Sequence, residues 1–235
     1  MKKMFSSSEK IGDIVARFPK ASDVFQRYNI DFCCGGDRPL KDAIDKHNID
    51  ENKLLAELEN EYEEMKNIIT KNTDWNKASF SDLIDHIVNT HHSYLQKELP
   101  IISELVTKIL RVHGIDHGDV LTRVHKLFNQ LKGELEQHLI KEEEILFPII
   151  KEYEENPSEE LRAKGIKVME ETENEHDNAG DILKELRKIT DNYTVPPSGC
   201  RSFSLTYEKL EELESDLFRH IHLENNILFV RFEGK

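Results

Sequence analysis

A ten-residue pattern occurs twice in this chain and constrains the fold more than any other feature. Residues 138–147 read His-Leu-Ile-Lys-Glu-Glu-Glu-Ile-Leu-Phe, and residues 220–229 read His-Ile-His-Leu-Glu-Asn-Asn-Ile-Leu-Phe. The His, the first Glu, the Ile, the Leu and the Phe recur at identical spacing, with an offset of 82 residues. Self-similarity of this kind indicates a duplicated helix hairpin.

Apolar residues recur at steps of three and four along most of the second half of the chain, which is the period of an amphipathic helix. The break at Asn156-Pro157-Ser158 offers Ser158 as an N-cap, and Pro100 is expected to bend the first helix. A turn is expected at 113–118 and a loop at 191–200. Four long helices with short connections predict an all-α antiparallel four-helix bundle. The expected helices cover residues 80–112, 119–153, 159–190 and 203–230.

The N-terminal part of the chain differs, because its helical stretches are short and are interrupted by Pro19, Cys33-Cys34-Gly35-Gly36 and Pro39. It is predicted to form a small separate helical domain over residues 1–65, and the bundle is predicted over 78–235. The polar stretch 71–74 is the expected linker. The alternative is one continuous all-α domain. The expected short helices cover residues 11–17, 21–28, 40–46 and 51–62.

Charge and cysteine content exclude several classes of function. The formal net charge of −14 repels phosphate backbones and argues against nucleic-acid binding. No apolar run approaches the roughly 20 residues that span a bilayer, and the N-terminus lacks the apolar stretch of a secretory signal. Three cysteines without a CxxC pair argue against a disulfide framework or a thiolate zinc site. We therefore expect a cytoplasmic protein that binds neither nucleic acid nor membrane.

Each copy of the repeat places a His and a Glu four residues apart, on one face of a helix. The Ile-Leu-Phe that comes after them puts the pair on the apolar side, where a carboxylate is costly unless it is paired or metal-bound. A single His-x3-Glu is more often the edge of a polar face. Two at matching positions favour a metal site, built on His138, Glu142, His220 and Glu224.

Two further histidine positions lie at matching distances from the expected helix ends. They are His176 on the third helix and the pair His91-His92 on the first. The numbers of residues between each of these histidines and the neighbouring turns are nearly equal. In an up-down-up-down bundle this places the histidines at a similar height along the bundle axis. Four imidazoles and two carboxylates exceed the four ligands of zinc, so they predict two bridged metals, of which iron suits the set. A ferritin-like site needs two Glu-x-x-His motifs, and only Glu173 with His176 is found.

These motifs resemble the hemerythrin-type di-iron bundle. Phe18-Pro19-Lys20-Ala21 and the segment 29–36, Asn-Ile-Asp-Phe-Cys-Cys-Gly-Gly, are similar to the leading domain of the repair of iron centres family, the ScdA- and YtfE-like bacterial proteins. The similarity covers nearly the whole chain. It implies a cytoplasmic protein with a non-haem di-iron centre, which helps to restore iron-sulfur clusters damaged by oxidative or nitrosative stress. A nitric-oxide-reducing activity is also implied.

The resemblance further implies a ligand set for two oxo-bridged iron ions. The helical phase alone puts His91 nearer the apolar stripe, whereas the register at Leu99-Pro100 selects His92. The implied partners are damaged iron-sulfur proteins, with NO or O2 as small ligands. The oligomeric state stays open, a homodimer included. The implied ligands are His92, His138, Glu142, His176, His220 and Glu224, with Glu142 and Glu224 as bridges.

Cys33 and Cys34 are candidates for a thiol role in redox chemistry or iron transfer. The alternative is that they are buried and have a structural role only. We expect an exposed tight turn at Gly35-Gly36, and thiolates that diverge too far to hold one metal together. The other cysteine and histidines are expected to be incidental: Cys200 lies in a loop, and His86, His125 and His222 lie at the surface or an edge. His113 and His117 flank a turn, and either could cap a helix end.

Two other functions remain open at this stage. A hemerythrin-like protein could bind or sense O2 or NO without turnover, and turnover of NO under anaerobic reducing conditions would distinguish this from NO removal. Iron storage is a third option and predicts many metals per chain. Within the repair function, either donation of iron from a labile centre or removal of NO fits the residues.

Overall fold

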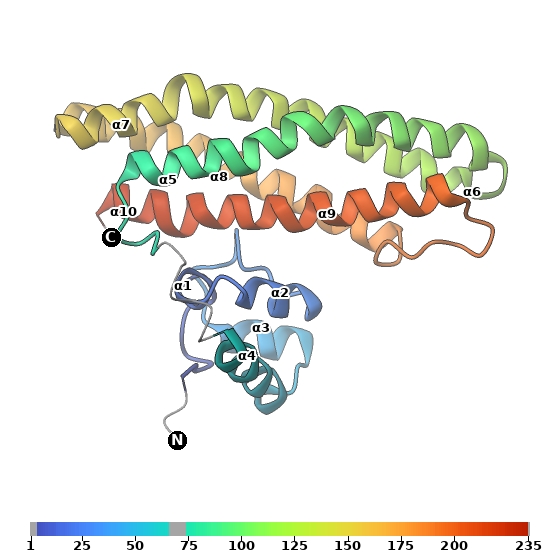
Figure 1. Ribbon diagram of the computed structural model, residues 1–235, viewed down its shortest axis with the longest axis horizontal. Helices are drawn as coiled ribbons and strands as arrows, with labels where there is room; N and C mark the ends of the chain where they lie inside the picture. The colour runs from blue at the N-terminus through green and yellow to red at the C-terminus, as the bar shows by residue number, and fades with distance from the viewer. Residues whose placement is uncertain (1–3, 66–73, 235) are drawn as a thin grey trace. The chain divides into compact units, whose positions relative to one another are not determined.

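The chain folds into helices that belong to two units. The computed structural model describes residues 4–65 and 74–234, and these contain helices and one isolated bridge between Lys10 and Pro39 (Figure 1). The chain divides into two compact units, residues 84–217 and residues 1–83 together with 218–235. The expected all-α class is confirmed.

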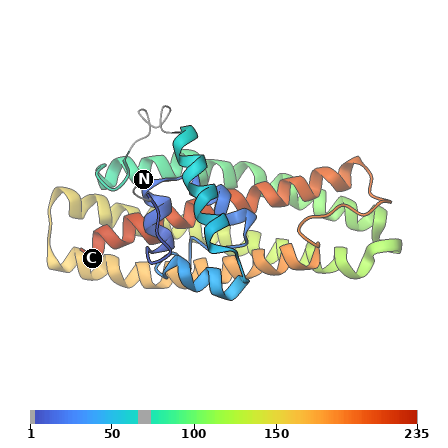
Figure 2. The same cartoon turned by 90° about the horizontal axis from the view of Figure 1, so that it is seen from below.

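The unit of residues 84–217 holds the long helices, which lie side by side and antiparallel (Figures 1 and 2). The chain reverses inside α6 at His117, whose φ of −130° and ψ of 21° are not helical. Both α6 and α7 pack against α8. The predicted antiparallel four-helix bundle is confirmed. Its elements are α5 (Phe80–Ile87), η2 (Val88–His92), α6 (Ser93–Lys141), η3 (Glu142–Leu146), α7 (Phe147–Glu155), α8 (Glu159–Ile189) and α9 (Arg201–Leu223), the last continuing into the other unit.

The apolar period that predicts these helices is the stripe that they bury. In the first arm of α6 it consists of Ile102, Val106 and Ile109. In the second arm it consists of residues 121, 124, 128, 131 and 135, all Leu, Val or Phe. Each such side chain contributes about 1.5–3 kcal/mol when fully buried. The expected cap of α8 is present, because the Ser158 hydroxyl accepts a hydrogen bond from Leu161 N at 3.2 Å.

The first turn of the bundle is shorter than the expected 113–118. Residues up to 116 are helical, and the single residue His117 breaks the helical path. The His113 ring is buried and packs on Phe203, with 5.3 Å between ring centroids. This packing offsets the roughly 1 kcal/mol that Gly114 costs a helix relative to Ala. His117 Nε2 lies 2.7 Å from Ser198 Oγ, so it contacts the loop before α9 and is not a helix cap.

The second unit contains the short helices predicted near the N-terminus. They are α1 (Ile11–Arg17), α2 (Ala21–Arg27), α3 (Leu40–His47) and α4 (Glu51–Met65). The C-terminal η4 (Glu224–Leu228) and α10 (Phe229–Glu233) belong to the same unit, where η4 contacts α1. Phe5, Phe18 and Tyr62 form an aromatic cluster with ring centroids 5.4–5.9 Å apart.

The C-terminal helix also holds the chain that leads into α5. The Arg231 guanidinium donates to Trp75 O at 2.8 Å and to Ala78 O at 2.6 Å, and it lies over the Phe80 ring. The expected linker 71–74 lies outside the described residues except for Asp74. None of the described helices is long and apolar enough to cross a membrane.

Candidate metal centre

In the described parts of the chain, three turns of π-helix interrupt the α-helices where the sequence predicts metal ligands. His92 is the last residue of η2, Glu142 is the first of η3 and Glu224 is the first of η4. The segments η3 and η4 occupy the same positions in the two copies of the repeat, so the backbone is duplicated together with the sequence. Single π-turns inside α-helices are frequent at functional sites.

Within the unit of residues 84–217, one buried carboxylate collects the histidine side chains. Glu142 Oε2 lies 3.3 Å from His92 Nε2 and 3.3 Å from His138 Nε2. His176 Nε2 lies 3.1 Å from His138 Nε2. All four side chains are buried, and Glu142 is completely so. Two imidazole nitrogens that face each other beside a carboxylate form a natural cation site, since all three atoms carry lone pairs.

The second copy of the repeat forms the corresponding pair on the last long helix. His220 Nε2 lies 2.9 Å from Glu224 Oε1, and both side chains are completely buried. The two copies are therefore alike in residue type, spacing and burial, and His220 and Glu224 offer the same kinds of ligand atom as His138 and Glu142. Within the unit of residues 84–217, His138, Glu142 and His176 each offer a ligand atom within 4.8 Å of the others. Imidazole nitrogens with a carboxylate oxygen are a donor set that suits a divalent transition metal.

Two carboxylates that the sequence analysis missed orient the histidines from outside. His92 Nδ1 donates to Glu143 Oε1 at 2.8 Å, and His138 Nδ1 donates to Glu175 Oε2 at 2.9 Å. Such bonds fix the ring so that Nε2 faces the metal. The hydrogen bond from His138, with another from Lys141, lowers the pKa of Glu175 to about 2. Glu143 and Glu175 directly adjoin the predicted ligands Glu142 and His176 in the sequence, and this adjacency was the signal that could have found them.

The neighbouring histidines of η2 take different roles. His92 Nε2 lies beside Glu142, whereas His91 Nδ1 lies 3.0 Å from Asp216 Oδ1. Both side chains are buried. The regular helical period favours His91 because it takes no account of a π-turn, which contains more residues per turn and shifts the helical phase of the residues after it.

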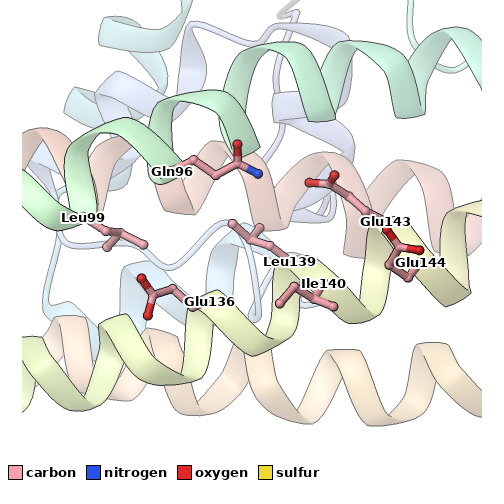
Figure 3. A pocket seen from close by; sticks show the side chains of 7 residues that line it. All are labelled: Gln96, Leu99, Glu136, Leu139, Ile140, Glu143 and Glu144. Carbon is pink, nitrogen blue, oxygen red and sulfur yellow. The ribbon is translucent and has the colours of Figure 1, made fainter.

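An open pocket of about 400 Å³ lies along α6 and η3 (Figure 3). Glu143 belongs to its wall and also accepts the hydrogen bond from His92 Nδ1, so the pocket reaches the outer side of the His92 partner. Three glutamates in the wall favour cations over anions. The lining residues are Gln96, Leu99, Glu136, Leu139, Ile140, Glu143 and Glu144.

The cysteine turn of the other unit differs from the expectation in two respects. Cys33 Sγ and Cys34 Sγ lie 3.7 Å apart, so the sulfurs converge, and Gly35 and Gly36 are buried instead of exposed. The Arg38 side chain covers Gly35, and Gly36 packs against the C-terminal segment. A Cβ added at Gly36 would lie 2.4 Å from Asn226 Oδ1. Burial raises the pKa of the Cys33 thiol well above its ordinary value.

The remaining cysteine and histidines differ in how deeply they are buried, and one of them departs from the expectation. His222 was expected at the surface or an edge, but it is buried, and burial lowers its pKa to about 4. His86 and His125 are partly exposed, as expected. Cys200 is exposed, and its Sγ lies 3.2 Å from His113 Nε2. This hydrogen bond lowers the pKa of the Cys200 thiol to about 7.

Comparison with known domain families identifies both parts of the chain. Residues 83–232 match the Hemerythrin HHE cation binding domain, and residues 7–62 match ScdA_N, which is described as a domain of unknown function. The chain belongs to the hemerythrin HHE cation-binding family. A cation-binding role therefore applies to the bundle, which is the part that contains the His and Glu groups.

Full-length relatives of this hemerythrin-type protein combine the same two parts. It is 36% identical over 230 residues to a probable iron-sulfur cluster repair protein of Haemophilus influenzae, covering 97% of this chain and 98% of the relative. It is 37% identical over 224 residues to the iron-sulfur cluster repair protein YtfE of Salmonella choleraesuis, covering 95% and 96%. It is 35% identical over 223 residues to YtfE of Shigella boydii, again covering 95% and 96%. The resemblance to the repair of iron centres family is thereby confirmed.

Proposed function

We propose that this protein repairs iron-sulfur clusters damaged by oxidative or nitrosative stress, and that a di-iron centre in the bundle performs this function. The observation that carries the proposal is the buried cluster of three histidines around Glu142 within residues 84–217, together with the buried His220–Glu224 pair that repeats its motif. Relatives named for iron-sulfur cluster repair, aligned over nearly their full length, supply the function.

The donor set fits iron better than the common alternatives. Structural zinc sites use four ligands and are usually rich in thiolate, whereas this set has four imidazoles, two carboxylates and no sulfur. His92 and His220 would hold one iron, and His138 and His176 the other. Glu142 and Glu224 would bridge them. When bound, the two irons would supply the redox chemistry with NO or O2, or would be given up to a damaged cluster.

The protein's own residues would bind the metal, orient its histidine ligands and keep water out of the site. Glu143 and Glu175 hold the Nδ1 side of His92 and His138, so the Nε2 side stays directed at the metal. Glu142 and Glu224 are completely buried, and a buried carboxylate is favourable only where it is paired or bound to a metal. The arrangement of these residues therefore favours a bound metal cation.

Several features of the biological setting belong to the same proposal. The clients would be damaged iron-sulfur proteins, the small ligands NO or O2, and the compartment the cytoplasm. Residues 1–65 and 78–235 would be the two domains. A homodimer is compatible with this function and is tested by solution mass.

The test combines metal analysis with a repair assay. The full-length protein, expressed in iron-replete medium, should contain about two irons per chain and show the absorption of an oxo-bridged diferric site. It should restore activity to an NO-treated iron-sulfur enzyme. Glu142→Gln should lose iron and repair together, while Glu144→Gln, on the exposed face of the same segment, should lose neither.

Three results would contradict the proposal. A single zinc at full occupancy would exclude the di-iron centre. Reversible binding of O2 or NO without any repair would favour a binding or sensing protein. Equal losses from Glu142→Gln and Glu144→Gln would show that local acidity matters and the placement of the carboxylate does not.

A further inference from the structure

The cysteine turn brings together three metal-binding side chains that the bundle does not use. Ligand atoms of Asp31, Cys33 and Cys34 all lie within 4.8 Å of one another. The two sulfurs are 3.7 Å apart. Metal–sulfur bonds of about 2.3 Å in tetrahedral geometry place two sulfurs about 3.8 Å apart. The sulfur separation therefore already matches that of two thiolates on one metal.

Hydrogen bonds from the backbone shape this turn without the help of a metal. Asp31 Oδ1 accepts from Cys33 N at 3.2 Å and from Gly35 N at 3.1 Å, which folds residues 31–35 around the carboxylate. On the other side, Asn226 Nδ2 donates to Cys33 O at 2.9 Å. The Gly12 N–H donates to Gly36 O at 2.7 Å. A preformed turn lowers the ordering cost of binding.

We propose that Asp31, Cys33 and Cys34 form a second metal site, which binds one thiophilic divalent cation through two thiolates and a carboxylate. Binding forms two metal–sulfur bonds, and each thiol loses its proton to solvent. None of the three ligands belongs to the proposed di-iron set. The physiological cation would be ferrous iron in transit, and this assignment alone rests on the proposed repair function.

The exposure of the three side chains suits a site that exchanges its cation. Cys33 is buried, whereas Cys34 and Asp31 are partly exposed. A cation would therefore enter on the side of Cys34 and Asp31. Three protein ligands leave one tetrahedral position for water or for a donor atom of a partner protein, as in open metal sites.

The experiment is a titration of the reduced, iron-loaded, full-length protein with Co2+ in the absence of oxygen. Sulfur-to-cobalt charge transfer absorbs in the near ultraviolet, and the nitrogen and oxygen ligands of the bundle cannot produce it. We expect this band to saturate at one cobalt per chain. Cys33→Ser and Cys34→Ser should each weaken cobalt binding more than about 100-fold. This exceeds the effect of losing a residue that only hydrogen-bonds to a metal ligand. Cys200→Ser is the matched control and should leave the band unchanged.

A carboxylate variant tests the third ligand without unfolding the turn. In Asp31→Asn the amide oxygen can still accept from Cys33 N and Gly35 N, but the negative charge is lost, and cobalt affinity should fall about tenfold. If Cys33→Ser does not fold, as judged by circular dichroism, Cys34→Ser and Asp31→Asn decide the question. Absence of the band in folded wild-type protein would overturn the proposal, as would a band that survives Cys34→Ser or disappears in Cys200→Ser.

The two proposals fail separately. The cobalt band depends on sulfur alone, and the iron count of the bundle depends on its His and Glu residues. A normal cobalt band on a protein without iron would reject the di-iron centre only. A normal iron content and normal repair without the cobalt band would reject the cysteine site only.

Discussion

The two copies of the ten-residue repeat share their inward residues and differ in their outward ones. In both, the His and Glu are buried, and a π-turn begins at the Glu. The positions after the Glu diverge. Glu143 of the first copy holds His92, and its neighbour Glu144 is exposed. In the second copy Asn226, the counterpart of Glu144, is hydrogen-bonded to the carbonyl of Cys33.

The apolar residues show the same contrast. Ile145 is 48% exposed, whereas its counterpart Ile227 is 2% exposed. Ile140 is exposed, and its counterpart His222 is buried. The inward face of the repeat is therefore the same in both copies, while the outward face meets solvent in the first copy and packs within the unit of the N-terminal helices in the second. The identical residues mark the function that the copies share.

The largest expected effect concerns the shared face. If the two carboxylates are equivalent bridges, Glu142→Gln and Glu224→Gln should reduce iron affinity by similar factors, each more than about 100-fold. Iron per chain after dialysis against a chelator is the measurement. A large loss in one variant beside a normal iron content in the other would break the equivalence of the copies at the metal.

The outward isoleucines should give the largest difference in stability. Ile227→Ala should lower the free energy of unfolding by about 2–5 kcal/mol, because it opens a cavity in a packed region. Ile145→Ala removes contacts from a half-exposed side chain and should stay within about 0.5 kcal/mol of wild type. Urea denaturation of the two metal-free variants provides the comparison. Equal losses would mean that the outward faces do not differ in packing.

Asn226 and Glu144 occupy the same position in the two copies and should also differ. Asn226→Ala removes the hydrogen bond to Cys33 O and leaves that carbonyl only the longer bond of 3.4 Å from Gly36 N, at a cost of about 0.5–1.5 kcal/mol. Glu144→Ala should have almost no effect, since its side chain is exposed. The same denaturation experiment tests both. An effect of Glu144→Ala as large as that of Asn226→Ala would remove the contrast between the copies.

The features that the sequence predicted correctly depend on local periodicity. The stripe of Ile102, Val106 and Ile109 is visible as steps of three and four, and Ser158 directly precedes a helical run. The fold class, the bundle and the short N-terminal helices are all predicted by such patterns. The proposed metal ligands were found in the same way, because a His and a Glu four residues apart share a face whatever surrounds them.

The features that it missed depend on residues distant in sequence or on irregular backbone. A π-turn leaves no mark on an i, i+4 pattern, so neither the side-chain direction of His91 nor the duplicated η3 and η4 was expected. The sulfurs converge because Asp31 folds the turn and Asn226, 193 residues after Cys33, holds its carbonyl. Glu175 reaches His138 from a different helix, and periodicity carries no information on such a pair.

The smallest expected effect concerns how the stability of the first copy of the repeat depends on pH. The pKa of Glu175 is about 2, below its ordinary value of 4.5, because His138 and Lys141 donate to the carboxylate. A depressed pKa stabilises the folded state above pH 4.5, and this contribution is lost as the pH falls toward 2. The Glu175 side chain is partly exposed, so solvent screening keeps its contribution small. Metal-free Glu175→Gln should therefore have a lower melting temperature than wild type at pH 6, and the gap should close as the pH falls below 4. Melting curves followed by circular dichroism between pH 6 and pH 3 test this, with Glu144→Gln as the matched exposed control. A gap that stays constant through this range would mean that Glu175 stabilises the first copy through its packing and that its charge contributes nothing.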